Sequence, residues 1–501
     1  MDIKALYKET DIRPNILSVI HDFRYVKGGS VGGTTLHLMD IIDGLRERYN
    51  FHVLYWSANT GKYHITSFFE QSEVTKVLGD FSSHRKEPWL KLYSKCFKDS
   101  VAEAVDALKI DVIHVHHIKN MFLDVFNVAK TKEIPLIYSV HDFYSICPSI
   151  NLMREDNSSC HLKENRECKV CSQKKFGIDF SYIELWQKEF GSALESASKI
   201  VAPADSTKKI LQSEYPSLNI DVIEHGYNIN VEPNKKDINN EILNIAFVGS
   251  ITKIKGLNLF VNLIPLVKGS KIRVHLFGTS HKISITSDGI NYINHGRYER
   301  EDLPKLLIDN NIDIVCLPSI CAETFSYTLS ESFMCNIPVI GLNIGAIAER
   351  IRRYDAGWVL PINTDAKQLF DFIEDIRTNK REEYLLKREN LKKHQVNMPS
   401  VAAMCSKYMN IYDSYIKNRE ERSKTSTLFF ENEDSFSIGV EIDKEGREEY
   451  RNLRDKITSE NLSYKSITKE IKEFRKHFPE SKLRNKIIFK LLWHKLSHKK
   501  M

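Results

Sequence analysis

The stretch that decides the fold of this chain is Pro318-Ser-Ile-Cys-Ala-Glu323-Thr-Phe-Ser-Tyr-Thr-Leu-Ser-Glu331-Ser-Phe-Met-Cys-Asn-Ile-Pro338-Val-Ile-Gly341. It follows the short apolar run Ile312-Asp-Ile-Val-Cys-Leu317, which predicts a buried parallel strand. A turn and a helix of about ten residues should come next, and Pro338 ends that helix before another strand. A strand that feeds a helix in this way points the free N–H groups of the helix toward the carboxyl edge of the sheet. Open α/β sheets bind ligands at that edge, and helix N-termini favour anions.

Glu323 and Glu331 are the two acidic residues of this stretch. If both were helical, they would lie about 80° apart around the axis, so one helix face would not hold both. We therefore expect Glu323 in the loop before the helix and Glu331 inside it, at most about 12 Å apart along the axis. That is roughly the span from the sugar to the ribose of a nucleotide-diphosphate sugar. The spacing alone is common in proteins, and the alternative interpretation is an ordinary strand-helix-strand unit whose glutamates are solvated.

The surroundings of the two glutamates resemble those of a known family. The segment Glu323-Thr-Phe-Ser-Tyr-Thr-Leu-Ser-Glu331, followed by Ile344-Gly-Ala-Ile-Ala-Glu-Arg350, is similar to glycosyltransferase family four, a large retaining group with the GT-B fold. Within that family it resembles the bacterial surface-polysaccharide branch. The resemblance implies an α/β protein with two facing Rossmann-like, doubly wound domains. It ends near residue 420, and a helical C-terminal extension follows.

The length of 501 residues predicts two or three domains, because one hydrophobic core does not usually extend that far. Met1 to Thr10 contain no apolar run typical of a secretory signal, and no window approaches the roughly 18 uninterrupted apolar residues of a membrane span. Nine cysteines in a chain without such a signal indicate a reducing cytoplasm rather than a disulfide framework. We therefore expect a cytoplasmic globular protein.

The formal net charge of +6 is concentrated at the C-terminus. Residues 482–501 contain seven Lys or Arg and no Asp or Glu, so subtracting these charges leaves −1 for the rest of the chain. A nearly neutral body argues against nucleic-acid binding. In the basic segment, Leu483, Ile487 and Leu491 share one face of a predicted helix, with Trp493 on its flank. This composition predicts a helix that lies peripherally on an anionic membrane surface or docks on a partner, and the alternative is a solvated or core-docked terminal helix.

A second strand-turn-helix unit begins at Asn15-Ile-Leu-Ser-Val-Ile20. The glycine-rich turn Gly28-Gly-Ser-Val-Gly32-Gly33-Thr-Thr35 follows, and then apolar residues at helical spacing. Glycines let the backbone approach an anion at a helix start, although this turn is neither a P-loop nor the dinucleotide fingerprint. The family resemblance implies that Gly32 and Gly33 face the donor diphosphate. The alternative is a turn that is glycine-rich for packing only.

Strands and helices alternate through residues 1–232, which we expect to form an N-terminal, acceptor-side domain with a parallel sheet. Further strands are predicted at Phe51–Tyr55, Val112–Val115, Leu136–Val140, Lys199–Ala202 and Asp221–Glu224.

Histidines follow two of these strands. His141 comes directly after Val140, where a side chain can reach into a cleft, and the resemblance implies that it contacts the donor sugar. The alternative is a histidine that is merely hydrogen-bonded beside a loop. His114, His116 and His117 lie at another strand end, and we expect them at the rim of the site, with metal binding as the alternative.

A polar insert at residues 147–171 carries Cys147, Cys160, Cys168 and Cys171. The final Cys-x2-Cys pair is typical of a zinc knuckle, and four thiolates close in sequence fit a tetrahedral structural site with no open position. A structural zinc ion would order a segment that has little apolar material. The alternative is four reduced, unligated cysteines.

The polar stretch from Asn228 to Asn240 predicts a linker, and residues 241–420 are expected to form the nucleotide-sugar-binding domain. This domain opens with another strand, glycine and helix, Leu243-Asn-Ile-Ala-Phe-Val-Gly249-Ser-Ile-Thr-Lys-Ile-Lys-Gly256.

Lys255 precedes Gly256 and is positioned to place an ammonium group on phosphate oxygens, as the resemblance implies. Relatives often carry a basic residue at the position of Ser250, and this departure leaves Lys253 as a substitute for the second cation. The alternative for Lys255 is a solvated lysine at a turn.

Strands are also expected at Ile272–Gly278 and near Ile290–Ile293. Loops after such strands hold the nucleotide base in relatives, so the resemblance implies roles for Gly278 and Tyr298. From Ala366 to about Asn418 the pattern is helical, and residues 400–418 are expected to cross back and brace the first domain, as the last helices of GT-B enzymes do. In the remaining extension, residues 421–501, the polar segment Ser423–Ser437 is expected to be loose.

Together these features predict a retaining glycosyltransferase that takes a nucleotide-diphosphate sugar as donor and a glycan or lipid-linked glycan as acceptor. Glu331 would accept the ribose hydroxyls, as carboxylates do in dinucleotide sites. Lys255, the N–H groups of Thr324 and Phe325, and the glycine turn of the first domain would stabilise charge on the leaving diphosphate. Glu323 and His141 would orient the donor sugar. The resemblance implies catalysis without an essential divalent ion.

Three alternatives remain open at the level of the sequence. The first is a GT-B sugar-nucleotide epimerase or phosphorylase, which product analysis would distinguish. The second is a catalytically weak scaffold subunit, against which Glu323, Glu331 and Lys255 argue and for which Ser250 leaves room. The third, a Rossmann oxidoreductase, is disfavoured because the dinucleotide fingerprint is missing.

Overall fold

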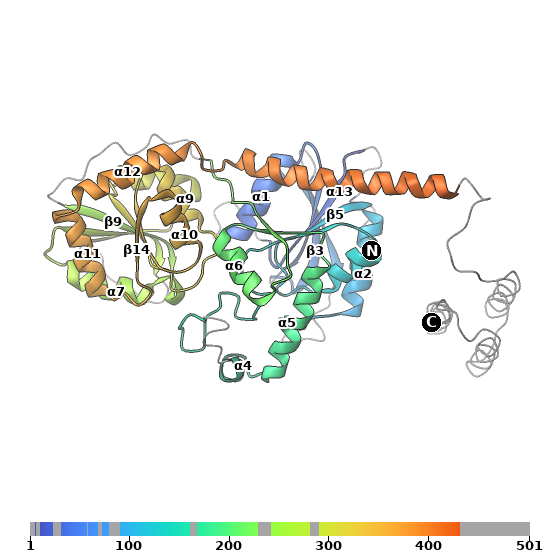
Figure 1. The fold of residues 1–501 in the computed structure, drawn as a ribbon, viewed down its shortest axis with the longest axis horizontal. Coiled ribbons are helices and arrows are strands. Elements are labelled where there is room, and N and C mark those ends of the chain that lie inside the picture. Colours follow the sequence, from blue (N-terminus) through green and yellow to red (C-terminus); the bar gives the residue numbers. More distant parts are fainter. Residues whose placement is uncertain are drawn as a thin grey trace, which may run out of the picture. The chain divides into compact units, whose positions relative to one another are not determined.

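The computed structural model describes residues 6, 11–23, 32–57, 59–68, 73–79, 91–160, 168–228, 242–280 and 290–430, with side chains described as far as residue 417. Contacts along the chain divide it into two units, Met1–Glu421 and Arg422–Met501. The first unit contains two sheets, each flanked by helices (Figure 1). None of the described helices combines the length and the apolar character that a membrane crossing requires.

The first sheet has eight strands in the order β4-β3-β2-β1-β5-β6-β7-β8. They are β1 (Asn15–Ile20), β2 (Asn50–Ser57), β3 (Lys62–Phe68), β4 (Glu73–Gly79), β5 (Ile110–Val115), β6 (Leu136–Ser139), β7 (Lys199–Ala202) and β8 (Ile220–Val222). The strands from β2 through β1 to β8 are parallel, whereas β3 is antiparallel to both β2 and β4. Parallel strands end at a common edge, so the segments after β5 and β6 meet there.

The second sheet has six strands in the order β11-β10-β9-β12-β13-β14, all parallel. They are β9 (Leu243–Ile251), β10 (Ile272–Ser280), β11 (Tyr292–Gly296), β12 (Ile314–Leu317), β13 (Val339–Leu342) and β14 (Gly357–Leu360). The strand before the decisive stretch, β12, lies in the middle of this sheet between β9 and β13. Its four residues are all buried, as a central parallel strand requires.

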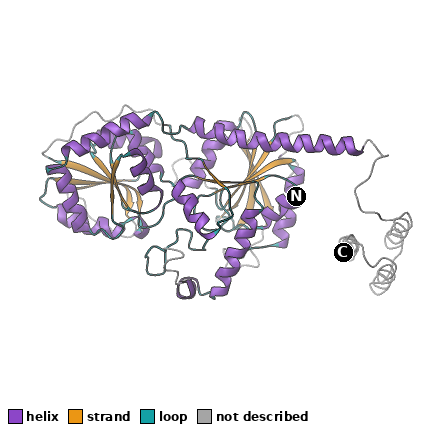
Figure 2. Ribbon diagram, viewed as in Figure 1, coloured by secondary structure: helices purple, strands orange, loops and turns teal. Residues whose placement is uncertain are grey.

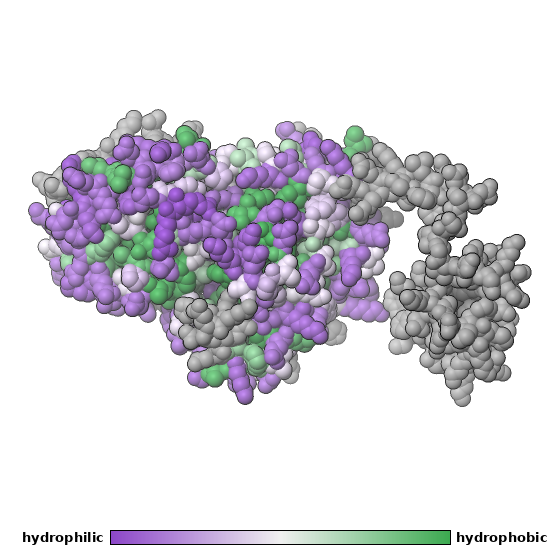
Figure 3. Space-filling view, viewed as in Figure 1, coloured by the Kyte–Doolittle hydropathy of each residue, from purple (hydrophilic) through white to green (hydrophobic). Residues whose placement is uncertain are grey.

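Helices cover both faces of each sheet (Figure 2). The helices are α1 (Gly33–Leu45), α2 (Lys95–Ala107), α3 (Asp124–Thr131), α4 (Cys168–Phe176), α5 (Phe180–Glu195), α6 (Asp205–Glu214), α7 (Leu257–Val267), α8 (Leu303–Asp309), α9 (Tyr327–Met334), α10 (Gly345–Tyr354), α11 (Ala366–Thr378), α12 (Arg381–Gln395) and α13 (Val401–Phe430), with two 3₁₀ turns, η4 (Lys253–Lys255) and η5 (Arg300–Asp302). In the first sheet α2, α3 and α5 pack on one side and α1 and α13 on the other. In the second, α7 and α11 oppose α8, α9 and α10. On the face drawn in Figure 3, hydrophilic residues cover most of the described surface.

The predicted doubly wound α/β architecture is confirmed, including the strands at Asn15–Ile20 and Lys199–Ala202. The antiparallel strands β3 and β4 were missed. The edge strand β4 exposes most of its residues and therefore carries little apolar signal, whereas β3 is a buried strand inside the sheet. The predicted loose segment at 423–437 is wrong in its first part, since α13 continues to Phe430 and a helix that is already formed extends at low cost. Most of the predicted linker and the basic segment 482–501 lie outside the described residues.

The prediction that residues 400–418 brace the first domain is confirmed by α13. Met404, Tyr408 and Tyr412 enter the same apolar cluster as residues of β1 and α1. The Tyr412 hydroxyl lies 2.7 Å from Nδ1 of the fully buried His114, whose Nε2 lies 2.8 Å from Ser139 Oγ. The last described helix therefore closes the core of the first sheet.

Replacing Tyr412 with Phe should lower the free energy of unfolding by about 1–2 kcal/mol, because it leaves a buried ring nitrogen of His114 without its partner. Chemical denaturation measures the loss. The matched control is Tyr415→Phe on the same helix, whose hydroxyl bonds the exposed carbonyl of Ser198 and should cost less than about 0.5 kcal/mol. Equal losses in the two variants would contradict this account of the brace.

Candidate functional site

The decisive stretch forms a loop after β12 and then α9. Glu323 lies in the loop and Glu331 lies within the helix, as the sequence predicts. The helix is shorter than expected and begins at Tyr327. Its N-cap is Ser326, which has the unusual φ of 82° and whose hydroxyl accepts a hydrogen bond from the N–H of Leu329. A residue other than glycine with positive φ is strained, and such strain is found most often at functional sites.

Gly345, at the start of α10, supports the loop from behind. It has a φ of 60°, and a Cβ atom there would lie 2.8 Å from both the backbone N and O of Glu323. The next residue, Ala346, donates its N–H to the carbonyl of Glu323 at 2.9 Å. Because no side chain fits at position 345, the backbone of α10 can hold Glu323 in place directly.

Lys255 and Glu323 lie beside each other, with 3.7 Å between Nζ and Oε1. Ser319 also donates its hydroxyl to Glu323 Oε1 at 3.1 Å. Gly256 follows Lys255 with a φ of 80°, and a Cβ there would lie 2.5 Å from the carbonyl of Pro318. The 3₁₀ turn η4 is thus packed closely on the loop, which places a half-exposed ammonium group and a carboxylate together at the end of β12.

Glu331 is buried, with 3% of its surface exposed, and its Oε1 lies 3.4 Å from Nε of Arg300. The Arg300 guanidinium lies over the rings of Tyr227 and Tyr327, at 4.9 and 4.6 Å from their centres. Burial raises the pKa of the Glu331 carboxyl to about 7, and the positive charge of Arg300 limits that rise. Burial raises the pKa of the Tyr298 hydroxyl, and the negative charge of Glu331 raises it further. Tyr298 therefore lies in the same region as Glu331. In its ionised form, this carboxylate can accept hydrogen bonds from hydroxyl groups of a ligand.

The glycine turn of the first sheet reaches the same region. Gly32 is the N-cap of α1 and forms no side-chain cap, so the N–H groups of the first turn are not satisfied by a capping side chain. A Cβ at Gly33 would lie 3.5 Å from the ring of Tyr327, the first residue of α9. The structure therefore brings the starts of two helices together.

Ser250 and Gly278 lie on neighbouring strands at the end of β9 and β10. The Ser250 hydroxyl accepts a hydrogen bond from Thr279 at 3.5 Å. Gly278 has a φ of 128°, and a Cβ there would lie 2.0 Å from the carbonyl of Gly249. Gly278 is thus required by close strand packing, which accounts for it without any ligand.

His141 follows β6 and is half-buried. Its carbonyl accepts a hydrogen bond from Thr324 Oγ1 at 2.8 Å, which ties it to the loop that carries Glu323. Burial lowers the pKa of the His141 ring to about 3, so the ring is neutral. Phe325 next to Thr324 is buried, and its ring centre lies 4.5 Å from that of His225.

The expectation that His114, His116 and His117 line the rim is wrong. All three are buried: α13 packs on His114, α1 brings His37 onto His116, and His117 lies against the rings of His21 and Tyr144. His114 is hydrogen-bonded at both ring nitrogens, and His117 pairs with Asp142. His116 has no hydrogen-bond partner among the described residues at either ring nitrogen.

Two arginines of the site were missed by the sequence analysis. One is Arg300 beside Glu331. The other is Arg350 of α10, which is 2% exposed and holds the loop from below. It bonds Glu224 Oε1 at 2.8 Å, the carbonyl of Ser326 at 3.1 Å and Ser330 Oγ at 2.8 Å. Its position six residues after Ile344 in the quoted motif was the available signal.

The four cysteines of the insert line one apolar pocket, together with residues such as Ile146. Burial raises the pKa of the Cys147 thiol to about 12, and the other three cysteines add to the rise. Their sulfur atoms do not gather in threes within 4.8 Å in the described part of the chain, so a shared ion would have to draw them together.

The raised pKa of Glu331 makes stability depend on pH. The unfolded carboxyl loses its proton near its ordinary pKa of 4.5, whereas the folded one retains it to about 7, so wild-type stability should fall between these pH values. Relative to Glu331→Gln, the fall should be at most about 3 kcal/mol, and denaturation at pH 5 and pH 7.5 measures it. Glu382→Gln, at an exposed glutamate in the first turn of α12, is the matched control. Parallel curves for wild type and Glu331→Gln would show that the carboxyl is not perturbed.

Two family models match this chain. "Glycosyltransferase Family 4" matches residues 31–231, and "Glycosyl transferases group 1" matches residues 228–395. The first match contains Gly32, Gly33 and His141, and the second contains Lys255, Glu323 and Glu331.

Similar proteins agree with these matches. An uncharacterized 41.2 kDa protein in the cps region of Klebsiella pneumoniae is 24% identical over 314 residues, which cover 61% of this chain and 80% of that protein. Among solved structures, sucrose-phosphate synthase from Thermosynechococcus elongatus has a TM-score of 0.55 at 14% identity, over 81% of this chain and all of the other. HepE of Anabaena, in complex with UDP, has a TM-score of 0.54 at 14% identity, over 80% of this chain and all of that one. At such identities the structures establish the fold, and the family models establish the relationship: this chain belongs to glycosyltransferase family 4 and has the GT-B fold.

Proposed function

We propose that this protein is a retaining glycosyltransferase that moves a sugar from a nucleotide-diphosphate donor to a glycan or lipid-linked glycan in polysaccharide biosynthesis. One observation carries the proposal: a buried glutamate paired with arginine on α9 and a lysine–glutamate pair on the preceding loop lie within one strand-loop-helix unit. The unit follows the central strand of a parallel sheet, at the edge where such sheets bind ligands.

Glu331 is assigned to the ribose of the donor. Its buried carboxylate can accept hydrogen bonds from both ribose hydroxyls. The Arg300 guanidinium, with Nε 3.4 Å from Glu331 Oε1, balances its charge. The aromatic rings of Tyr227 and Tyr298 adjoin this pair and offer flat apolar surfaces for the base.

The leaving diphosphate is assigned to Lys255, the backbone N–H groups of Thr324 and Phe325, and the N-terminus of α1 at Gly32 and Gly33. Negative charge grows on the diphosphate as the sugar leaves, and fixed donors aimed at that charge stabilise the transition state. The half-exposed Lys255 ammonium can exchange its contact with Glu323 for phosphate oxygens, since such partly solvated pairs are worth little.

Glu323 and His141 are assigned to the hydroxyl groups of the donor sugar. Both are held by backbone contacts, Glu323 by Ala346 and His141 by Thr324. This fixed placement supports orientation of the donor sugar. Retention of configuration and catalysis without an essential divalent ion are proposed from the family relationship.

The comparisons support the substrate classes. The relative from a cps region supports a role in polysaccharide synthesis, and the UDP complex of HepE supports a nucleoside diphosphate as the donor half. A glycan on a lipid carrier would be met at a membrane, for which the basic segment 482–501 remains the proposed contact, with a cytoplasmic location and no nucleic-acid partner.

The insert at 147–171 is proposed to bind a structural zinc ion through Cys147, Cys160, Cys168 and Cys171. The shared apolar pocket supports this, because four nearby thiols in apolar surroundings are the donor set that zinc prefers. The ion would supply charge compensation and a cross-link for the insert, and no part in sugar transfer.

Replacing Lys255 should lower the turnover rate, whereas replacing Glu331 should weaken nucleotide binding. Lys255→Ala should lower kcat by about 10²–10³-fold, because it removes one fixed electrostatic contact to the transition state. Glu331→Gln should weaken nucleoside diphosphate binding by about 10–100-fold at pH 8, where the wild-type residue is a carboxylate. Steady-state kinetics and calorimetry measure the two effects, and NMR of the first product gives its anomeric configuration.

Lys253→Ala, on the same 3₁₀ turn, is the comparison for Lys255. An equal loss of kcat in that variant would reassign the phosphate contact to Lys253. Full activity in Lys255→Ala together with unchanged nucleotide binding in Glu331→Gln would contradict the proposed site. A product whose anomeric configuration is inverted, or an epimerised nucleotide sugar, would contradict the proposed reaction.

A cysteine double variant tests the zinc proposal separately. Purified wild-type protein should contain one zinc ion per chain more than Cys168→Ser/Cys171→Ser, and this variant should show faster proteolysis within residues 147–171 and retain transfer activity. Metal analysis and limited proteolysis measure the outcome. Metal-free wild-type protein with the same proteolytic pattern as the double variant would rule out a structural zinc ion here.

A further inference from the structure

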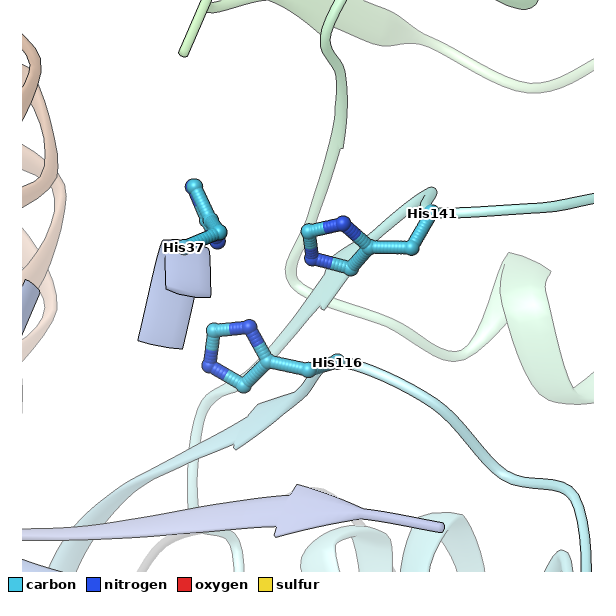
Figure 4. A group of neighbouring side chains, drawn as sticks. All are labelled: His37, His116 and His141. Atoms are coloured by element: carbon cyan, nitrogen blue, oxygen red, sulfur yellow. The ribbon is translucent and has the colours of Figure 1, made fainter. Parts of the chain in front are cut away.

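Three histidines from separate elements converge inside the first domain, as Figure 4 shows. His37 lies on α1, His116 directly follows β5, and His141 follows β6. One ring nitrogen from each lies within 4.8 Å of the others. No other group of three possible metal-ligand side chains is this close among the residues that the structure describes.

These nitrogens are buried and unsatisfied. Both ring nitrogens of His37, both of His116 and Nε2 of His141 have no hydrogen-bond partner among the described groups. Leaving a buried polar atom unpaired costs about 1–3 kcal/mol, so a set of five would be expensive unless something fills it. Two other buried histidines are fully paired: His52 contacts Ser67 and Asn15 through its two nitrogens, and His114 is likewise paired on both sides.

No charged partner among the described groups is hydrogen-bonded to these five nitrogens. Asp142, the carboxylate next to His141 in the sequence, is already paired with His117. Neutral imidazole is the form that binds transition metals, and it is a poor ligand for Mg²⁺ or Ca²⁺.

We propose that His37, His116 and His141 bind one divalent transition-metal ion of the zinc type. Three imidazoles leave a fourth position open in a tetrahedral site. His225 stacks on His37 with 4.1 Å between ring centres and has an unsatisfied Nδ1, but it is not one of the three residues whose nitrogens lie within 4.8 Å of one another. The ligands come from α1 and from the ends of β5 and β6, so the ion cross-links three elements of the first domain.

The ion and the donor sugar would compete for His141. A ring nitrogen that ligates a metal cannot also bond a sugar hydroxyl, so zinc should inhibit transfer reversibly. This consequence rests on the proposed function, whereas the metal site itself does not.

Cobalt(II) is the probe for the test, because its spectrum reports the ligands. Chelator-treated protein titrated with Co²⁺ should develop the strong visible bands of a tetrahedral histidine site at one ion per chain, in addition to any ion held by the cysteines, and Zn²⁺ should remove these bands. A site made of imidazoles gives no thiolate-to-cobalt charge-transfer band in the near ultraviolet, whereas ions in the cysteine pocket would. The titration is therefore done in the Cys168→Ser/Cys171→Ser background as well, where the visible bands should persist.

His37→Gln and His116→Gln should each weaken Co²⁺ binding by at least about a hundredfold, since loss of a ligand should exceed the roughly 10–100-fold cost of losing an outer-shell partner. His64→Gln is the matched control: this buried histidine of β3 contacts Thr60 and lies outside the cluster. Circular dichroism of each metal-free variant verifies its fold. Wild-type protein without tetrahedral visible bands, bands that vanish with the cysteines, or unchanged affinity in both folded variants would overturn the proposal. If transfer activity is absent under all conditions, the proposed function fails and the titration still decides the metal site.

Discussion

The buried guanidinium of Arg350 is the contact on which the arrangement of the site depends. It lies 4.1 Å above the Phe325 ring and bonds the backbone at Ser326, the side chain of Ser330 and the carboxylate of Glu224. Breaking a buried ion pair on one side costs about 3–5 kcal/mol, because the remaining charge is left uncompensated in the interior. The strained N-cap of α9 can persist because these contacts over-determine it. The loop with Glu323 and the helix with Glu331 are thereby fixed relative to each other.

Around this fixed unit, backbone contacts hold the functional groups in place, and the charged side chains pair with one another. Backbone contacts hold the groups that need accurate placement, as Gly345 does for Glu323 by allowing α10 to approach. The charged side chains are paired with one another, Lys255 with Glu323 and Arg300 with Glu331. In the proposed function, such pairs keep the charged groups stable in the absence of substrate and leave them available to the phosphate oxygens and ribose hydroxyls of the donor. Preorganisation of this kind is the usual source of electrostatic catalysis.

Much of this could be predicted from the sequence, because it depends on local patterns. Apolar runs bounded by turns located β1, β7 and β12, and the placement of Glu323 before the helix and Glu331 inside it follows from helix geometry. The missed features depend on partners far apart in the chain. Arg350 pairs with Glu224, and no spacing rule connects positions 126 residues apart.

The histidines also show that contacts between distant parts of the chain are not predictable from local sequence patterns. The position of His116 at a strand end was interpreted as a rim position, since the sequence does not say what covers that edge. The covering elements are α1, which brings His37, and α13, which returns from the far end of the fold. The fate of a strand-end residue is therefore decided by tertiary packing, and the strand pattern itself leaves it open.

The most direct test of the central claim is a crystal structure of the protein with the nucleoside diphosphate that stabilises it most in a thermal-shift panel. The account predicts that the two ribose hydroxyls lie within hydrogen-bond distance of the Glu331 carboxylate, with the Lys255 ammonium turned from Glu323 onto phosphate oxygens. A nucleotide bound elsewhere, with Glu331 still in contact with Arg300 alone, would contradict it.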